Sequence, residues 1–217
     1  MPLNMPITQT GYAFSSYSGG SLSHPHTISA GNNQVLFLLL GFTSASGFSS
    51  VQWNGTAMTQ VGSTNVFYLI NPARGSYNVT LNWSGGGLCY IASISYANVH
   101  QYTPCGTPSS TTGNVATSSI TISSADDELV IDLVLAYRPL NQAQRVDVGA
   151  GQTALTAMAP GAYVEDSNAR AFGVSTEPGA SSVTMSWAIY DSAAGSSSNQ
   201  LAVAIKPAPP SSFLAVF

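Results

Sequence analysis

Two histidines separated by one proline, in the segment His24-Pro25-His26, form the first pattern that could support chemistry. Residues two apart in an extended strand project from the same face, so both imidazoles would point the same way. Paired imidazoles of this kind occur in zinc and nickel sites. A third ligand is not evident in the neighbouring sequence, and Pro25 indicates an edge strand or a turn. We therefore expect exposed polar residues at the start of a strand, with a metal site as the alternative.

Acidic residues gather in Asp126-Asp127-Glu128, directly before a strongly apolar segment. Glycosidases use paired carboxylates, and calcium prefers clustered oxygen ligands. Neighbouring residues of a strand point to opposite faces, so these carboxylates would not converge. We expect a solvated turn here, with a structural calcium site as the alternative, and we interpret Glu165-Asp166 in the same way.

Asp132 lies inside the apolar segment Leu129–Leu135. Burying a carboxylate without a partner is costly. The sequence therefore predicts a structural ion pair between Asp132 and either Arg138 or Arg170, with a catalytic acid as the alternative.

The elements that must position these residues are β-strands. Sustained periodicity of 3.6 residues is absent, and short runs rich in Val, Ile, Thr, Tyr and Phe recur between turn signals such as Asn54-Gly55 and Pro178-Gly179. This pattern predicts an all-β sandwich or jelly roll. The expected strands are Gly11–Tyr17, His26–Ser29, Gln34–Phe42, Ser50–Trp53, Met58–Ser63, Asn65–Ile70, Ser76–Trp83, Leu88–Tyr96, Ser118–Ile122, Leu129–Tyr137, Gln152–Met158, Arg170–Ser175, Ser182–Ile189 and Gln200–Ile205.

An internal repeat runs through the chain. The order of the echoes is the same in both halves, and each half retains a tryptophan. The echoed pairs are Thr27-Ile28-Ser29 with Thr121-Ile122-Ser123, Val35–Leu38 with Leu129–Asp132, Tyr77–Trp83 with Ser181–Trp187, and Ile91–Ser95 with Leu201–Ile205.

The repeat divides the chain into an arm (residues 1–10), a β-sandwich (11–207) and a tail (208–217). The repeat halves are about 11–99 and 113–207, joined by a Pro, Ser and Thr-rich stretch around Thr103–Thr112. Val35–Leu40 and Leu129–Leu135 are nearly continuous apolar runs, which are typical of central strands covered on both faces. We favour one fused sandwich, and two Ig-like sandwiches in tandem are the alternative.

Charged residues make up only 6% of the 217 residues, against about 25% in typical proteins, and the formal net charge is −4. The basic surface that nucleic-acid binding requires is missing. No signal peptide begins the chain, and no apolar run is long enough to span a membrane. Two cysteines do not make a disulfide framework, so Cys89 and Cys105 are expected as buried free thiols. No nucleotide-binding loop or other cofactor motif occurs.

Several segments resemble a family of internally duplicated β-sandwich proteins of tailed-phage virions and bacterial surfaces. The resemblance rests on strand-and-turn patterns that span most of the chain: Ser50–Met58, Tyr68–Pro72, Gly75–Thr80, Ala125–Asp132, Pro178–Ala180 and Ala202–Pro207. It implies a structural or adhesive role, and it carries no catalytic residues.

These observations favour a non-enzymatic structural protein of a phage virion, made in the host cytoplasm. The function expected first is that of a capsid decoration (cement) subunit, with a tail or fibre component and a carbohydrate-binding or adhesin module as alternatives. Expected partners are further copies of the chain and a major capsid or other virion protein, with glycans as a further candidate. The apolar tail residues Phe213, Leu214, Val216 and Phe217 follow a stiff proline segment, so we expect them to dock on a neighbour.

Overall fold

The computed structural model describes residues 5–42, 48–83, 88–113, 116–137, 145–155, 170–190 and 197–210. Its regular structure in these ranges consists of β-strands, which pair antiparallel in four sheets. The predicted all-β sandwich is therefore confirmed. No helix long and apolar enough to cross a bilayer occurs in these ranges.

The first half of the chain supplies two of the four sheets. The first inner sheet has the order β1 (Thr8–Ser18), β9 (Leu88–Ala97), β3 (Val35–Phe42), β7 (Val66–Ile70) and β6 (Thr59–Gln60). The first outer sheet has the order β2 (Ser21–Ile28), β8 (Gly75–Trp83), β4 (Phe48–Trp53) and β5 (Thr56–Ala57).

The second half supplies the other two sheets. The second inner sheet has the order β10 (Ser109–Gly113), β17 (Ser197–Ile205), β12 (Leu129–Tyr137), β15 (Arg170–Pro178) and β14 (Thr153–Ala154). The second outer sheet has the order β11 (Thr117–Ile122), β16 (Val183–Tyr190) and β13 (Arg145–Val148).

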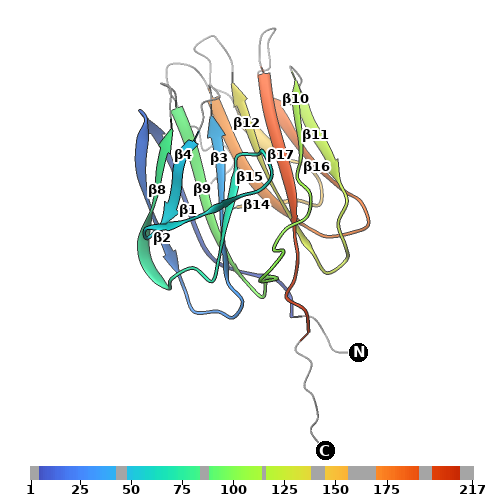
Figure 1. Ribbon diagram of the computed structural model, residues 1–217. Helices are drawn as coiled ribbons and strands as arrows, with labels where there is room; N and C mark the ends of the chain where they lie inside the picture. The colour runs from blue at the N-terminus through green and yellow to red at the C-terminus, as the bar shows by residue number, and fades with distance from the viewer. Residues whose placement is uncertain are drawn as a thin grey trace, which may run out of the picture.

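The four sheets stack as layers, with the two inner sheets face to face in the middle. Figure 1 shows the first half (blue to green) beside the second half (yellow to red). Apolar residues from both inner sheets, such as Phe37, Leu39, Ile131, Leu133 and Val203, form one cluster. Separate clusters lie between each inner sheet and its own outer sheet. Each half thus has its own two-sheet sandwich, and the two sandwiches share a core.

This layering explains the two apolar runs of the sequence. Every residue of β3 is buried, and β12 is buried except at its two end residues. A strand with protein on both faces has no side that can carry polar residues at low cost, so alternation is lost. The prediction that Val35–Leu40 and Leu129–Leu135 are central strands is confirmed.

The strand order of the second half matches that of the first when β10, β11, β12 and β13 are set against β1, β2, β3 and β4. The two halves therefore share one strand order. The ladders nevertheless correct two of the sequence echoes. Ile28 lies opposite Gly75, whereas Ile122 lies opposite Val183. When β2 is matched to β11, Gly75 of β8 corresponds to Val183 of β16. Trp187 then corresponds to Val79, and Trp83 lies four residues beyond Val79 on β8.

The echo between β9 and β17 is out of register by one residue. Val35 lies opposite Tyr96, and Leu129 lies opposite Ile205, so Tyr96 matches Ile205. The sequence echo matched Ser95 with Ile205 instead. A shift of one residue exchanges the two faces of a strand. Both strands place small or apolar residues on each of their two faces, so the alternation that would have fixed the register is weak.

Three strands were not predicted from the sequence: the two-residue strand β5, β10 and β13. β10 lies in the stretch interpreted as a linker, because Ser-Ser-Thr-Thr-Gly lacks the large apolar residues that signal a strand. β13 (Arg145–Val148) lies in a polar region and pairs only with β16 among the described strands. The predicted strand Met58–Ser63 is limited to Thr59–Gln60. Cys89 is buried and Cys105 half-buried, and both are free thiols as expected.

We predict that Phe172→Ala destabilises both halves together, by about 3–5 kcal/mol. Phe172 is buried and stacks on Phe14 and Tyr90 of the first half, with 5.6 Å between ring centroids in each pair. Urea unfolding measures the loss, and hydrogen exchange reports each half separately. Tyr102→Ala is the control, because Tyr102 is 88% exposed, and should change stability by less than about 0.5 kcal/mol. Exchange that accelerates only in the second half would contradict the shared core.

Candidate functional site: two buried polar networks and a cleft

His24 and His26 are buried, with 0% and 3% of their surfaces exposed, so the expectation of exposed residues is wrong. Both side chains lie on the inward face of β2, as the spacing of two predicts, and Pro25 between them faces outward. Among the described strands β2 pairs only with β8 and is an edge strand, which confirms the interpretation of Pro25. The sequence did not show that this edge strand is covered by β1 and β9.

The two imidazoles are joined by serine hydroxyls into a continuous network. Ser93 Oγ lies 2.8 Å from His24 Nε2 and 2.8 Å from His26 Nδ1. The network continues at both ends, where Ser15 Oγ lies 3.1 Å from His24 Nδ1 and Ser95 Oγ lies 3.2 Å from His26 Nε2. A hydroxyl has one proton, so Ser93 donates to one imidazole and accepts from the other. Two neutral imidazoles satisfy this arrangement.

A β-bulge in β1 closes the network against solvent. The ladder with β9 shifts between Gln9 and Gly11, and Thr10, the extra residue, donates its hydroxyl proton to Ser95 Oγ at 3.1 Å. A Cβ on Gly11 would lie 2.5 Å from Thr27 O and 2.7 Å from Ser95 Oγ. Glycine is therefore required for β1 to approach β2 this closely.

Burial, together with the neighbouring His26, lowers the pKa of His24 to about 4. Burial also lowers the pKa of His26 to about 4. Serine hydroxyls beside imidazoles are the ingredients of nucleophilic catalysis. Ser93, Ser95 and His24 have no exposed surface, so a substrate cannot reach them. No cluster of three His, Cys, Asp or Glu side chains suited to a metal ion occurs in the described ranges.

Asp132 is fully buried between the second inner and outer sheets, and neutral donors hold its carboxylate. Trp187 Nε1 donates to Oδ2 at 2.6 Å, Gln200 Nε2 donates to Oδ2 at 2.9 Å, and Ser175 Oγ donates to Oδ1. Arg170 lies opposite Tyr137, five residues along β12, so the predicted ion pair with Arg170 is wrong. Arg138 lies outside the described residues.

Polar side chains around Asp132 extend this network through the second half. Ser118 Oγ donates to Gln200 Oε1 at 2.8 Å, and Gln152 Nε2 donates to Ser175 Oγ at 2.7 Å. Burial raises the pKa of Asp132 to about 6, and the bonds from Ser175, Trp187 and Gln200 oppose this rise. The carboxylate has no route to solvent, so it acts as an internal acceptor that fixes its donors.

The remaining acidic and aromatic candidates have structural surroundings. Asp126 and Asp127 are exposed, and Glu128 Oε2 accepts from Ser124 Oγ at 3.0 Å and from Ala125 N at 3.1 Å. The predicted solvated turn before β12 is confirmed. Trp53, Trp83 and Trp187 are all buried, so these side chains pack in the core. Glu165 and Asp166 lie outside the described residues.

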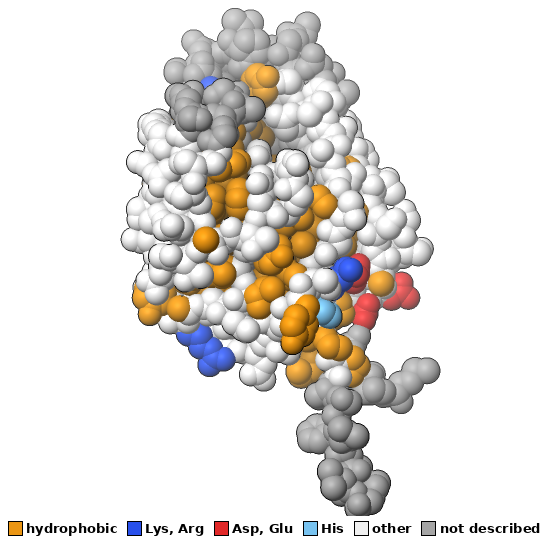
Figure 2. Space-filling view, viewed as in Figure 1, with side chains coloured by type: hydrophobic (Ala, Val, Ile, Leu, Met, Phe, Trp, Pro, Cys, Tyr) orange, Lys and Arg blue, Asp and Glu red, His pale blue; other side chains and the backbone are white. Residues whose placement is uncertain are grey.

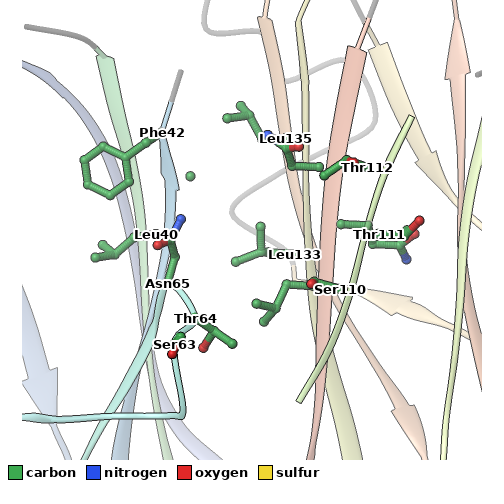
Figure 3. A pocket seen from close by; sticks show the side chains of 14 residues that line it. Leu40, Phe42, Ser63, Thr64, Asn65, Ser110, Thr111, Thr112, Leu133 and Leu135 are labelled. Atoms are coloured by element: carbon green, nitrogen blue, oxygen red, sulfur yellow. The ribbon is translucent and has the colours of Figure 1, made fainter. Parts of the chain in front are cut away.

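A cleft of about 210 Å³ opens between the two halves. Its walls are the end of β3 and the turn before β7 on one side, and β10, β12 and β17 on the other (Figure 3). Leu133 and Leu135 point into the space, whereas Leu40 and Phe42 point away from it. The lining residues are Leu40, Gly41, Phe42, Ser63, Thr64, Asn65, Ser110, Thr111, Thr112, Leu133, Leu135, Asn199, Gln200 and Leu201, and all are uncharged.

Sequence analysis missed this cleft and the partners of both networks. Ser93, Ser175 and Gln200 are distant in sequence from the histidines and from Asp132, so no local spacing marks them. The available signal is the presence of polar residues inside apolar strands, such as Ser93 and Ser95 in β9. The predicted interaction residues Phe213, Leu214, Val216 and Phe217 lie outside the described residues.

The surface around the cleft is largely neutral. Figure 2 shows one face on which charged side chains are few, and hydrophobic side chains gather along the middle and at the lower end. Comparison of the chain with protein-family models, with curated proteins and with solved structures gives no match.

We predict that His24→Gln/His26→Gln loses less stability than the wild type between pH 6.5 and pH 4. In this window the unfolded chain binds protons at His24 and His26, but the folded chain keeps both imidazoles neutral, so acidification favours unfolding. A pKa of about 4 against 6.5 corresponds to about 3 kcal/mol for one imidazole. Urea unfolding at several pH values measures the difference, and equal pH dependence of both proteins would contradict it.

Asp132→Asn should act in the opposite direction. The folded pKa of Asp132, about 6, exceeds its unfolded value, so the folded chain binds this proton first and gains stability as the pH falls from 6 to 4. Removing this contribution should make the acid-induced loss larger than in the wild type, by about 3 kcal/mol at most. The same urea series measures it, and a smaller loss than in the wild type would contradict the assignment.

Proposed function

We propose that the protein is a non-enzymatic structural component of a phage virion, and that it acts first of all as a capsid decoration subunit. The observation that carries this proposal is the position of the two ends of the described chain. Asn98 Nδ2 donates to Pro6 O at 2.9 Å, and Asn98 O accepts from Ala208 N at 2.8 Å. Both terminal segments are thus fixed at one end of a four-layer body.

This end, which we name the attachment end, exposes apolar side chains. Met5 is 54% exposed and Tyr102 is 88% exposed, and Pro209 and Pro210, which follow Ala208, are exposed as well. His100 N donates to Lys206 O at 2.9 Å, and Lys206 N donates to Pro104 O at 2.9 Å, so backbone bonds hold this end rigid. Preformed apolar surface on a rigid support suits docking, because little conformational entropy is lost on binding.

The neutral surface supports the same proposal. Burying charged groups at an interface costs desolvation energy, which Ser, Thr, Asn and Gln do not incur to the same extent. Asp132, His24 and His26, the groups with the greatest catalytic potential, are committed to hydrogen bonds inside the core. The protein would therefore act through its stability and through the surface area that it buries against a partner, which is a further copy of itself or a major capsid protein.

A carbohydrate-binding or adhesin module is the second candidate. The uncharged cleft between the halves favours it, since half of the lining residues carry hydroxyl or amide groups on Ser, Thr or Asn side chains. Nucleic-acid binding is not proposed, because Lys and Arg together number only five in the whole chain.

We predict that the chain co-purifies with virus particles at a copy number set by the capsid lattice. Quantitative mass spectrometry of gradient-purified particles measures the ratio of this chain to the major capsid protein. A ratio far below one copy per capsid vertex, or absence from particles, would contradict the decoration role. A low ratio fixed at the number of tail subunits would favour a tail or fibre component.

Attachment should depend on the attachment end. We predict that Tyr102→Ser, and separately deletion of residues 211–217, reduce binding to particles stripped of the protein by about tenfold or more, because apolar anchors dominate interface energies. Sedimentation with stripped particles measures binding. Tyr77→Ser is the matched control, because Tyr77 is exposed on β8 of the first outer sheet, and it should bind normally. Full binding by both test variants would contradict this attachment surface.

A further inference from the structure

The gap between the two inner sheets is filled on one side of the β3–β12 crossing and open on the other. The crossing is marked by Gly41 and Leu135, because a Cβ on Gly41 would lie 3.6 Å from Leu135 Cβ. In the sequence echo that sets Val35 against Leu129, Gly41 corresponds to Leu135. The residues paired with Gly41 and with Leu135 in the two β-ladders therefore occupy equivalent positions on the two sides of the crossing.

Aromatic rings fill the first side. Phe172 of β15 lies opposite Leu135, and Tyr90 of β9 lies opposite Gly41. Phe172 stacks on Tyr90 with 10° between the ring planes, and on Phe14 of β1 with 23°. Three rings from three strands thus occupy the space between the sheets.

Small polar residues occupy the matching positions on the second side. Asn199 lies opposite Leu135 and so takes the place of Tyr90. Leu201, two residues after Asn199, lies opposite Ser110 of β10. Ala92, two residues after Tyr90, lies opposite Phe14 of β1. Ser110 therefore takes the place of Phe14. Leu40 N donates to the carbonyl oxygen of Asn65. In the same pairing the next residues, Thr64 and Gly41, lie opposite each other. Thr64 thus takes the place that Phe172 has on the first side.

The cleft therefore has a defined origin: three rings are replaced by a hydroxyl, a second hydroxyl and an amide. Its volume of about 210 Å³ is below the roughly 300–1,000 Å³ of sites for drug-sized ligands, so a single ring fits better than a long molecule. Leu133, Leu135 and Leu201 give it an apolar wall. Ser110, Thr112 and Asn199 are exposed around it.

We propose that this cleft binds one ring of an uncharged saccharide. Hydroxyl and amide side chains can exchange hydrogen bonds with sugar hydroxyls in both directions, and leucines can cover the C–H face of the ring. Because the lining is uncharged, nothing in it would compensate a phosphate, sulfate or carboxylate for lost hydration. An apolar or aromatic side chain of a partner fits less well, because it would cover the hydroxyls and the amide without offering them bonds.

The walls of this site are rigid, which favours binding without ordering costs. Thr64 Oγ1 donates to Val61 O at 2.7 Å and accepts from Val66 N at 3.2 Å, so its turn is fixed. Gln200, the neighbour of Asn199, is held by Asp132 and by Met185 O. The network around Asp132 thereby supports one wall of the cleft.

The filled side of the molecule supplies the test variant. Ser110→Phe/Asn199→Tyr places on the open side two of the rings that close the other side, so it should fold at least as stably as the wild type. Ser119→Phe/Thr121→Tyr adds the same two rings to the exposed face of β11 and serves as the control. The probes are methyl glycosides of glucose, galactose, mannose and N-acetylglucosamine, their uncharged dimers, and glucuronic acid as the charged comparison.

Saturation-transfer NMR and titration of methyl chemical shifts measure binding by the intact chain. We expect the wild type and the control to bind at least one neutral probe with a dissociation constant of about 1 mM or tighter, with shifts at Leu133, Leu135 and Leu201. Binding by the filled variant should fall about tenfold or more.

Several results would overturn the proposal. These are failure of every neutral probe to bind the wild type, undiminished binding by a folded Ser110→Phe/Asn199→Tyr variant, and preference for glucuronic acid. Perturbation of the leucine methyls only by an aromatic peptide would also overturn it. If the Ser110→Phe/Asn199→Tyr variant does not fold, the wild type alone tests the proposal: a neutral probe must shift the methyl signals of Leu133, Leu135 and Leu201, and the absence of these shifts would overturn it. The result is independent of the decoration role, since a subunit can occupy a particle with or without a sugar in this cleft.

Discussion

β3 and β12 cross face to face at the centre of the molecule, and each is covered on its other face by an outer sheet. A strand in this position meets no water, so hydrophobic burial along its whole length holds the four layers together. The stacked rings of Phe14, Tyr90 and Phe172 extend this contact on one side of the crossing. The low charge of the chain follows partly from this architecture, because strands β3, β9 and β12 of the two inner sheets are buried along almost their whole length.

The polar groups inside the layers are tolerated because they bond to each other. His24 and His26 share Ser93, and Asp132 accepts hydrogen bonds from Trp187, Gln200 and Ser175. An unbonded polar group in such surroundings costs about 1–3 kcal/mol, so each network is favourable only when complete. The two networks lie in different halves and use different residues. Their contributions to stability change with pH in opposite directions between about pH 6 and pH 4, so they partly offset each other.

The two halves share one strand order but differ in the side chains at equivalent positions, and this difference produces the cleft. Where the ladders set aromatic rings on one side, they set Thr64, Ser110 and Asn199 on the other. A packed region and a cleft can thus arise from one framework by changes at three positions, without any change of topology. The attachment end, where Asn98 binds both terminal segments, lies away from this cleft and leaves it free for a separate role.

The sequence by itself determined most of the strands, the class of fold and the central position of β3 and β12, because these depend on residue types that follow one another along the chain. It also placed both histidines on one face of a strand, because the period of a strand is fixed by its backbone. It did not show that this face is buried, that neutral donors rather than an arginine hold Asp132, or that Trp83 and Trp187 occupy different levels. Only the tertiary structure decided these points and the cleft, since each depends on strands that pair or stack across long stretches of sequence and on registers that apolar strands do not encode locally.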